Sequence, residues 1–402
     1  MPQIKPEVES FARIKVIGVG GSGKNTVNHM INSKVKGVDF IAINTDAQDL
    51  HNSLAKKKIH IGKNLTRGLG TGMDPELGKR AVEETKEEVQ EALKGADMVF
   101  IACGMGGGTG SGAAPSIART AKENSCLTVA VVTKPFFFEG VQRMRIAEQA
   151  IEDLKQAVDA LIIIPNDRLL QTIEKDVTAK QAFATCDDIL KQAVEGISDL
   201  ITTPGFINID FADIRAVLEN AGAALMGIGQ ASGDKRAEDA ALAAISSPLL
   251  EVSINGAKGV LFSIAAGDDL TMFEIQEAAK VITESVDPNA RIIFGTVRND
   301  KLKKGEIKIT VIASNFPEGN MRKGTSLFQA LGNDEEKGRG KIFNSFGSSS
   351  KDSNKSAEEA PPDTKKKSTP ASTPTSATSP TIDKEDDDWG AVPAFLRRSK
   401  LK

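Results

Sequence analysis

The residues of this chain best suited to hold a ligand lie at 103–112, in the stretch Cys-Gly-Met-Gly-Gly-Gly-Thr-Gly-Ser-Gly. An apolar, β-favouring run at 96–102 precedes this stretch, and a helix-favouring run at 113–122 follows it. Glycines are costly inside a strand or a helix, but they suit a tight turn whose amides a ligand approaches closely. Amides at a helix start attract anions, and Thr109 and Ser111 add hydroxyl donors. We therefore predict a phosphate cradle rather than a flexible surface loop.

A second glycine-rich turn follows the first expected strand, at 13–20. Its sequence, Gly-Val-Gly-Gly-Ser-Gly-Lys-Asn at 18–25, matches the dinucleotide fingerprint GxGxxG and nearly matches the P-loop GxxxxGK[ST]. Asn25 stands where a P-loop needs a hydroxyl group for magnesium, which disfavours that interpretation. Asp46 could bind a ribose, as in a Rossmann oxidoreductase. The later glycine cluster argues against such a protein, because a dinucleotide site does not need a second phosphate cradle.

Two further segments are open to either a structural or a ligand-binding interpretation. The glycine-rich loop at 62–75 could be a mobile connection before a charged helix at 75–93, or it could meet a ligand. Glu139 and Arg143 lie four residues apart at the start of an expected helix at 142–158. They could form a helix ion pair, or they could bind a sugar through a carboxylate and a guanidinium.

Polar side chains interrupt an apolar run at 206–213. Asn208, Asp210 and Asp213 are its polar members, and the two aspartates would share one side of a helix. They could cap that helix, with Asp210 at the N-cap and Asp213 three residues later. Alternatively, the pair could orient a water molecule or a cation.

Alternating strands and helices must position these groups. The expected strands lie at 13–20, 38–44, 96–102, 127–133 and 161–164. This alternation predicts an α/β fold with a doubly wound parallel sheet, in which ligands bind across the carboxyl ends of the strands. A helix at 179–202 has one apolar face and is a candidate spine between two domains.

The pattern changes after this helix. Strands at 260–266, 291–297 and 306–314, with a helix at 272–285, predict a smaller α+β domain in which the last two strands pair around 299–305. Residues 345–382 are too polar to form a core, so we expect disorder. The predicted divisions are a flexible N-terminus at 1–12, a nucleotide-binding domain at 13–178, a central helix at 179–202, an α+β domain at 203–316, a disordered linker at 317–383 and a partner-binding peptide at 384–402.

Composition narrows the classes of protein further. The 402 residues carry a net charge of −3, which argues against a general nucleic-acid-binding surface. The 3 cysteines lack CxxC spacing, so they suggest reduced thiols in a cytoplasmic protein rather than disulfides or a metal site. The net charge leads us to expect no nucleic-acid partner. No signal peptide and no membrane-spanning run is recognisable in the sequence, so we expect no direct membrane insertion.

Seven motifs together resemble a known family. The loop at 106–112 resembles the signature of the tubulin/FtsZ superfamily, and the remaining motifs narrow the resemblance to the FtsZ family of bacterial cell-division GTPases. The six other motifs lie, in family order, at 17–25, 44–48, 68–72, 133–140, 208–213 and 393–397. The resemblance covers about 13–316 and resumes at the tip. It implies a tubulin/FtsZ-like fold: a Rossmann-like parallel-sheet GTPase domain, a long central helix, a smaller α+β domain and a disordered C-terminal tail.

The resemblance also implies roles for individual residues toward GTP. It assigns to the phosphates Gly21, Ser22, Gly23, Lys24, Asn25, Thr71, Gly72, Gly108, Thr109 and Gly110. It assigns Glu139 and Arg143 to the ribose and Asn166, Phe183 and Asp187 to guanine, where a carboxylate could accept from N1 and N2. Ser22 and Lys24 depart from the glycines that the family often has, and Lys24 adds a positive charge.

Finally, the resemblance implies that the site is shared between copies. Asn208, Asp210 and Asp213 would reach the GTP of the next subunit in a head-to-tail filament, where the aspartates position the attacking water and Mg²⁺ neutralises the phosphates. The Trp389–Arg398 peptide would bind membrane-anchoring and regulatory division proteins at mid-cell, near the inner face of the membrane. Two alternatives stay open: a nicotinamide-dependent Rossmann oxidoreductase and a filament protein that does not hydrolyse GTP.

Overall fold

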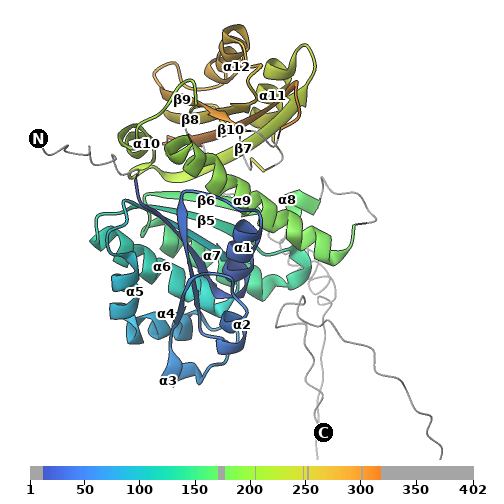
Figure 1. Ribbon diagram of the computed structural model, residues 1–402. Coiled ribbons are helices and arrows are strands. Elements are labelled where there is room, and N and C mark those ends of the chain that lie inside the picture. Colours follow the sequence, from blue (N-terminus) through green and yellow to red (C-terminus); the bar gives the residue numbers. More distant parts are fainter. Residues whose placement is uncertain are drawn as a thin grey trace, which may run out of the picture. The chain divides into compact units, whose positions relative to one another are not determined.

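A computed structural model of the chain describes residues 12–317, except for gaps at 171–176, 204, 248, 251–252 and 300–301 (Figure 1). The expected flexible N-terminus, disordered linker and partner-binding peptide therefore lie outside the described residues, apart from Ala12 and Pro317. The predicted domain boundaries stay predictions.

Within the described residues, ten strands form one sheet in the order β3-β2-β1-β4-β5-β6-β7-β10-β8-β9. The first six strands are parallel neighbours, which confirms the predicted parallel sheet. They are β1 (Ile14–Val19), β2 (Val38–Asn44), β3 (Lys57–His60), β4 (Met98–Gly104), β5 (Leu127–Lys134) and β6 (Ala160–Pro165). Residues 98–103 of the central strand β4 are all buried, because helices cover both faces of the sheet.

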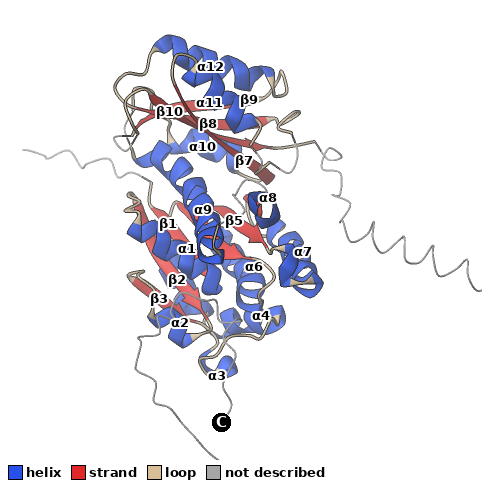
Figure 2. Ribbon diagram, turned by 90° about the vertical axis from the view of Figure 1, so that its right-hand side faces the viewer, coloured by secondary structure: helices blue, strands red, loops and turns tan. Residues whose placement is uncertain are grey.

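Helices pack on the two faces of this sheet (Figures 1 and 2). One face forms a core with α1 (Gly20–Asn32), α9 (Ala179–Thr202) and α10 (Phe211–Leu218). The other forms a core with α4 (Pro75–Glu84), α5 (Lys86–Leu93), α6 (Gly108–Glu123) and α7 (Val141–Lys155). The short helices are α2 (Ala47–His51), α3 (Lys63–Thr66), η1 (Phe137–Glu139) and α8 (Asn166–Leu170).

The long helix expected at 179–202 is confirmed with those bounds. Thr178 caps it by accepting from the Gln181 amide at 3.3 Å, and the Gln181 side chain accepts from the Thr178 amide at 3.0 Å. Leu190, Val194 and Ile197 are buried on its apolar face. The helix expected at 75–93 is instead two helices, α4 and α5, which are interrupted at Thr85.

The C-terminal part contains β7 (Gly222–Ser232), α11 (Arg236–Ile245), β8 (Gly259–Ala266), α12 (Met272–Glu284), β9 (Arg291–Arg298) and β10 (Glu306–Ser314). The predicted pairing of the last two strands is wrong, because β8 lies between them. β8 is parallel to β9 and antiparallel to β10. Nearly every residue of β8 is buried, which suits a central strand, whereas β9 is partly exposed and forms an edge.

The glycine-rich stretches extend into helices, contrary to the expectation that they form turns. α1 begins at Gly20, and α6 begins at Gly108, within the glycine cluster. Close packing accounts for this arrangement. A Cβ atom at Gly112 would overlap the carbonyl oxygen of Pro75, and one at Gly78 would overlap that of Gly108. Glycine therefore lets α4 and α6 approach each other closely, which offsets its entropic cost in a helix.

Candidate nucleotide-binding site

The carboxyl ends of β1 and β4 bring the two predicted phosphate-binding turns together. Val19 at the end of β1 pairs with Cys103 of β4. A Cβ atom at Gly20 would lie 3.3 Å from the Gly110 amide nitrogen, and one at Gly104 would lie 2.9 Å from the Ser22 side chain. The structure describes every residue in the first turns of α1 and α6, and neither turn contains an acidic residue. Two helix N-termini therefore converge on one place, which is an arrangement that favours an anion.

The third glycine-rich loop, at 62–75, lies beside the N-terminus of α6. A Cβ atom at Gly108 would overlap the Thr71 hydroxyl, so this loop lies directly against the start of α6. The Thr109 hydroxyl lies 2.8 Å from the Thr45 hydroxyl and 3.4 Å from the Thr71 hydroxyl. A side chain at Gly72 would meet no described atom within 4 Å. Three loops thus gather hydroxyl groups beside the converging helix ends.

Two hydroxyl residues have roles that the sequence did not reveal. Ser111 is buried, and its hydroxyl accepts from the Gly106 amide at 2.9 Å, so it braces the loop. Thr45 contacts Thr109 but was not among the predicted site residues. Its position directly after the carboxyl end of β2 was the available signal, because ligands bind at that edge of a parallel sheet.

Phe183, one of the predicted guanine-binding residues, packs against a second phenylalanine, Phe136. The rings of Phe136 and Phe183 meet edge to face, with centroids 5.4 Å apart. The Phe137 amide donates to Asp167 at 2.9 Å, which holds this loop against the start of α8. There, Asn166 is buried, and its Oδ1 atom has no hydrogen-bond partner among the described residues. A ligand with a suitable donor would satisfy this oxygen.

Asp187 links the base side of the site to the phosphate side. The Thr26 hydroxyl of α1 donates to Asp187 Oδ1 at 2.7 Å. Burial raises the pKa of Asp187 from 3.8 to about 6, and hydrogen bonding from Thr26 opposes that rise. Because α1 starts at the phosphate turns, it connects both parts of the predicted nucleotide site.

Glu139 and Arg143 form the ion pair that one interpretation predicted. Arg143 Nη1 donates to Glu139 Oε2 at 2.7 Å, and Glu139 Oε1 accepts from the Phe136 amide at 3.0 Å. The pair therefore stabilises the loop that carries the aromatic residues. A contact of this pair with ribose stays a prediction.

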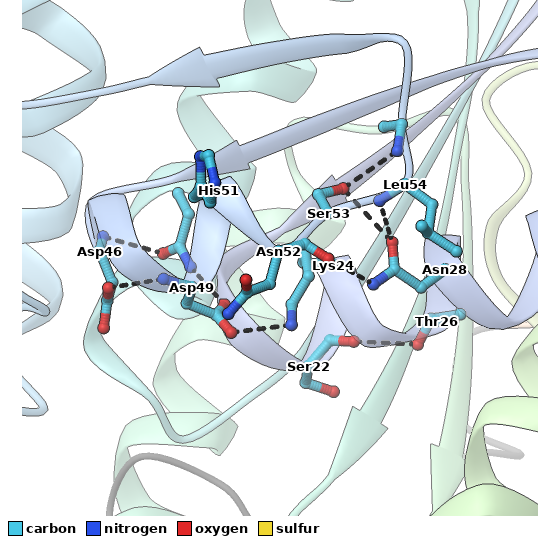
Figure 3. A network of polar contacts seen from close by, with 12 residues as sticks. Ser22, Lys24, Thr26, Asn28, Asp46, Asp49, His51, Asn52, Ser53 and Leu54 are labelled. Atoms are coloured by element: carbon cyan, nitrogen blue, oxygen red, sulfur yellow. Dashed lines mark hydrogen bonds and ion pairs between the residues drawn. The ribbon is translucent and has the colours of Figure 1, made fainter. Parts of the chain in front are cut away.

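Lys24 has a carboxylate partner within the protein. Its Nζ atom lies 2.8 Å from Asp49 Oδ1, and Asn44 donates to Asp49 Oδ2 at 2.8 Å (Figure 3). In the same helix, Gly21, Ser22 and Asn25 are exposed, whereas Gly23 is buried.

The carboxylates of the 206–213 segment lie elsewhere. Asp210 is the N-cap of α10 and accepts from the Ala212 amide at 3.4 Å, which confirms the capping interpretation for this residue. Asn208 accepts from the Gly205 amide at 2.7 Å. Asn208, Asp210 and Asp213 are all exposed, so each is accessible to another molecule.

These residues are at the opposite edge of the sheet from the glycine-rich turns. After α10, Gly222 pairs with Ala160 at the amino end of β6, whereas the turns follow the carboxyl ends of β1 and β4. α9 connects the two regions, with α8 near one end and α10 near the other (Figure 1). From Asp187 to Thr202 this helix extends about 22 Å, at about 1.5 Å per residue. One copy therefore does not bring its own aspartates to its glycine-rich turns.

Two features are absent from the described residues. No group of three or more His, Cys, Asp or Glu side chains there could hold a metal ion. None of the helices within the described part is both long and apolar enough to span a bilayer.

The fold and the site define a nucleotide-binding protein of the doubly wound α/β class. Residues 13–174 match the GTPase domain of the Tubulin/FtsZ family, and residues 222–317 match the C-terminal domain of the FtsZ family. The chain thus belongs to the FtsZ family, carries a tubulin-like GTPase domain and binds GTP.

Solved structures agree with this assignment. An empty FtsZ dimer from M. jannaschii is 44% identical, with a TM-score of 0.73 over 76% of this chain and 89% of that one. A point mutant of FtsZ from M. jannaschii is also 44% identical, with a TM-score of 0.72 over 76% of this chain and 91% of that one. A GTPγS-bound CetZ2 protofilament from Haloferax volcanii, at 21% identity, shares the fold with a TM-score of 0.67 over 81% and 99% of the two chains.

Proposed function

We propose that this protein hydrolyses GTP and polymerises head-to-tail, and that each active site is completed by the next copy. The observation that carries the proposal is the separation of the two parts of the site. The glycine-rich turns lie at the carboxyl edge of the parallel strands, whereas Asp210 and Asp213 are exposed beyond the amino edge. A contact between these different surfaces is heterologous and need not close, so it generates filaments.

Exposed apolar side chains flank both parts of the site. Leu69, which is 70% exposed, lies in the loop that carries Thr71 and Gly72. Phe137 and Phe138, which are 63% and 59% exposed, lie in η1 beside Glu139. At the other end, Phe206, Met272 and Phe273 are 70%, 73% and 68% exposed. Large apolar groups exposed in this way favour a protein–protein interface.

Phe206 and the pair Met272 and Phe273 all lie beside the edge strand β9. Met272 and Phe273 line an open surface depression with Phe294 of β9. Ile207, the neighbour of Phe206, donates through its amide to the Thr296 hydroxyl of the same strand. This patch therefore lies close to the segment that carries the aspartates. It supports a contact in which these aspartates meet the nucleotide of another copy.

The proposed chemistry follows from the side chains. Asp213 and Asp210 orient a water molecule toward the γ-phosphate, and the converging helix ends stabilise the anionic phosphates. Mg²⁺ keeps most of its ligands as water and phosphate oxygens, so the lack of a carboxylate cluster among the described residues is compatible with it. The hydroxyls of Thr71 and Thr109 are the oxygen donors that would hold it, and it would supply charge neutralisation.

The base is proposed to be guanine. Ionised Asp187 accepts from the N1 and N2 groups of guanine, which adenine cannot match, and Asn166 Oδ1 gains a donor. In the cell, we propose that the filaments form the division ring at mid-cell in the cytoplasm. The Trp389–Arg398 peptide would recruit membrane-anchoring and regulatory partners, a proposal that rests on its sequence alone.

The test replaces one carboxylate of the segment on α10. Asp213→Ala should bind GTP and pellet with it as the wild type does, but release phosphate about 100-fold more slowly, because a group that positions the attacking water is lost. Glu219→Ala, which removes an exposed carboxylate at the other end of the same helix, is the matched control.

Mixing two variants tests whether the site is shared. Ser22→Trp blocks the exposed phosphate turn but keeps Asp213, so it should restore turnover to Asp213→Ala. Normal turnover by Asp213→Ala alone, or no restoration in the mixture, would contradict the proposal. Binding of NAD without assembly would favour an oxidoreductase, and assembly without phosphate release a structural filament.

A further inference from the structure

A largely buried ion pair lies beside the phosphate turn, and the proposed hydrolysis does not use it. Lys24 of α1 and Asp49 of α2 are joined at 2.8 Å, with only 8% and 23% of their side chains exposed (Figure 3). The contact links the first turns of the helix that binds phosphate to the helix that follows β2. It also gives the Lys24 ammonium group an anionic partner before any phosphate arrives.

Asp49 lies very close to the backbone that phosphates would approach. A Cβ atom at Gly21 would lie 3.6 Å from Asp49 Oδ2, and Gly21 is exposed. Without a cation beside it, this carboxylate would repel an anionic ligand at the turn, because the two negative charges would lie close together. The favourable field of the converging helix ends would be partly cancelled.

The same carboxylate is connected to the other phosphate loop. Asp49 Oδ2 accepts from Asn44 Nδ2, and Asn44 Oδ1 accepts from the Thr45 amide at 2.9 Å. The Thr45 hydroxyl then contacts the Thr109 hydroxyl at the start of α6. A displacement of Asp49 would therefore be transmitted to both turns.

We propose that Lys24 is a positioning residue that neutralises Asp49, so that the turn accepts a nucleoside triphosphate without Lys24 binding the phosphates itself. This inference rests on the proposed GTP site. It assigns to Lys24 a role different from the direct phosphate contact that the family resemblance implies.

The proposal makes a charge-dependent prediction. Lys24→Met should weaken GTP binding on the order of 10- to 100-fold, because Asp49 becomes an unpaired negative charge near the phosphates. GDP should lose less affinity, since it carries one phosphate group fewer. Lys24→Met/Asp49→Asn should bind GTP within about threefold of the wild type, because the repulsive charge has also been removed.

The experiment measures dissociation constants for GTP and GDP with the full-length, nucleotide-free protein, at about 50 and 300 mM salt. Lys36→Met, which removes an exposed lysine of the same charge, is the matched control. Lys24→Arg should stay near the wild type. Thermal melting shows whether each variant folds. If Lys24→Met does not fold, Lys24→Met/Asp49→Asn provides the test, because this double variant contains no unpaired buried charge.

The outcomes separate the possible roles. A folded double variant that binds GTP on the order of 10- to 100-fold more weakly than the wild type would show that Lys24 contacts the phosphates directly, and would overturn the proposal. Equal losses for GTP and GDP that salt does not change would indicate a merely structural pair, and would also overturn it. A wild-type protein that binds no guanine nucleotide would instead refute the proposed function.

Discussion

We expect the largely buried carboxylate of Asp187, the proposed guanine contact, to make GDP binding sensitive to pH. Burial raises its pKa to about 6 in the nucleotide-free protein, and only the ionised form can accept from both N1 and N2 of guanine. About nine tenths of Asp187 is ionised at pH 7 and about one tenth at pH 5. Affinity for GDP should therefore fall about 10-fold over this interval through Asp187 alone.

The matched control is Asp187→Asn. The diphosphate group also titrates in this range, but its contribution is common to both proteins, so the ratio of their dissociation constants isolates Asp187. The variant should bind GDP about 30-fold more weakly at pH 7, as expected for the loss of charge-assisted hydrogen bonds. This difference should shrink toward pH 5. A ratio that is constant from pH 5 to 8 would refute the assignment.

The same pKa has a consequence for stability. The folded state holds the Asp187 proton more tightly than the unfolded chain, whose pKa is near 3.8, so stability of the nucleotide-free fold decreases as pH rises from about 4 to 6. The rise of the Asp187 pKa from 3.8 to about 6 corresponds to about 3 kcal/mol. Asp187→Asn should consequently raise the melting temperature at pH 7.5 and not at pH 4. An unchanged melting temperature at both values would show that the carboxylate is better hydrated than its burial indicates.

Two further predictions concern the fold. Gly112→Ala should lower the free energy of unfolding by about 1–3 kcal/mol, because the new methyl group collides with the Pro75 carbonyl. The control Gly107→Ala should change the free energy of unfolding by less than about 0.5 kcal/mol. Urea titration measures both values, and equal effects would contradict the packing argument. Arg236 is 6% exposed and bonds to two carboxylates, so Arg236→Met should cost about 3–5 kcal/mol, while Lys235→Met on the surface should cost almost nothing. A melting temperature of Arg236→Met equal to that of Lys235→Met would refute this estimate.

The parallel sheet and its ligand-binding edge could be predicted from the sequence because the strands are continuous apolar runs that end in glycine-rich or polar loops. The central helix was equally clear from its apolar face. Pairing of the C-terminal strands could not be predicted, because the burial that places β8 at the centre involves contacts between residues far apart in the chain.

Within the candidate site, local sequence patterns identified the glycines but not the residues that contact one another from distant parts of the chain. The glycines at 108–112 look like a turn because their helical packing against α4 depends on a distant segment. The Lys24–Asp49 ion pair joins residues of two helices separated by a strand, and nothing in the spacing of either residue indicates it. Thr26 and Phe136 were missed for the same reason, since each acquires its role from a contact with α9.

The separation of the glycine-rich turns from Asp210 and Asp213 determines how many complete active sites a filament contains. If each complete site needs two adjoining copies, an isolated copy contains none, and a linear filament of n copies contains n−1. One terminal copy then carries a nucleotide that no neighbour attacks, and the opposite terminal copy carries carboxylates without a nucleotide. Turnover per copy should therefore be smallest in short filaments and approach a plateau as they lengthen, and the two filament ends must be chemically different throughout.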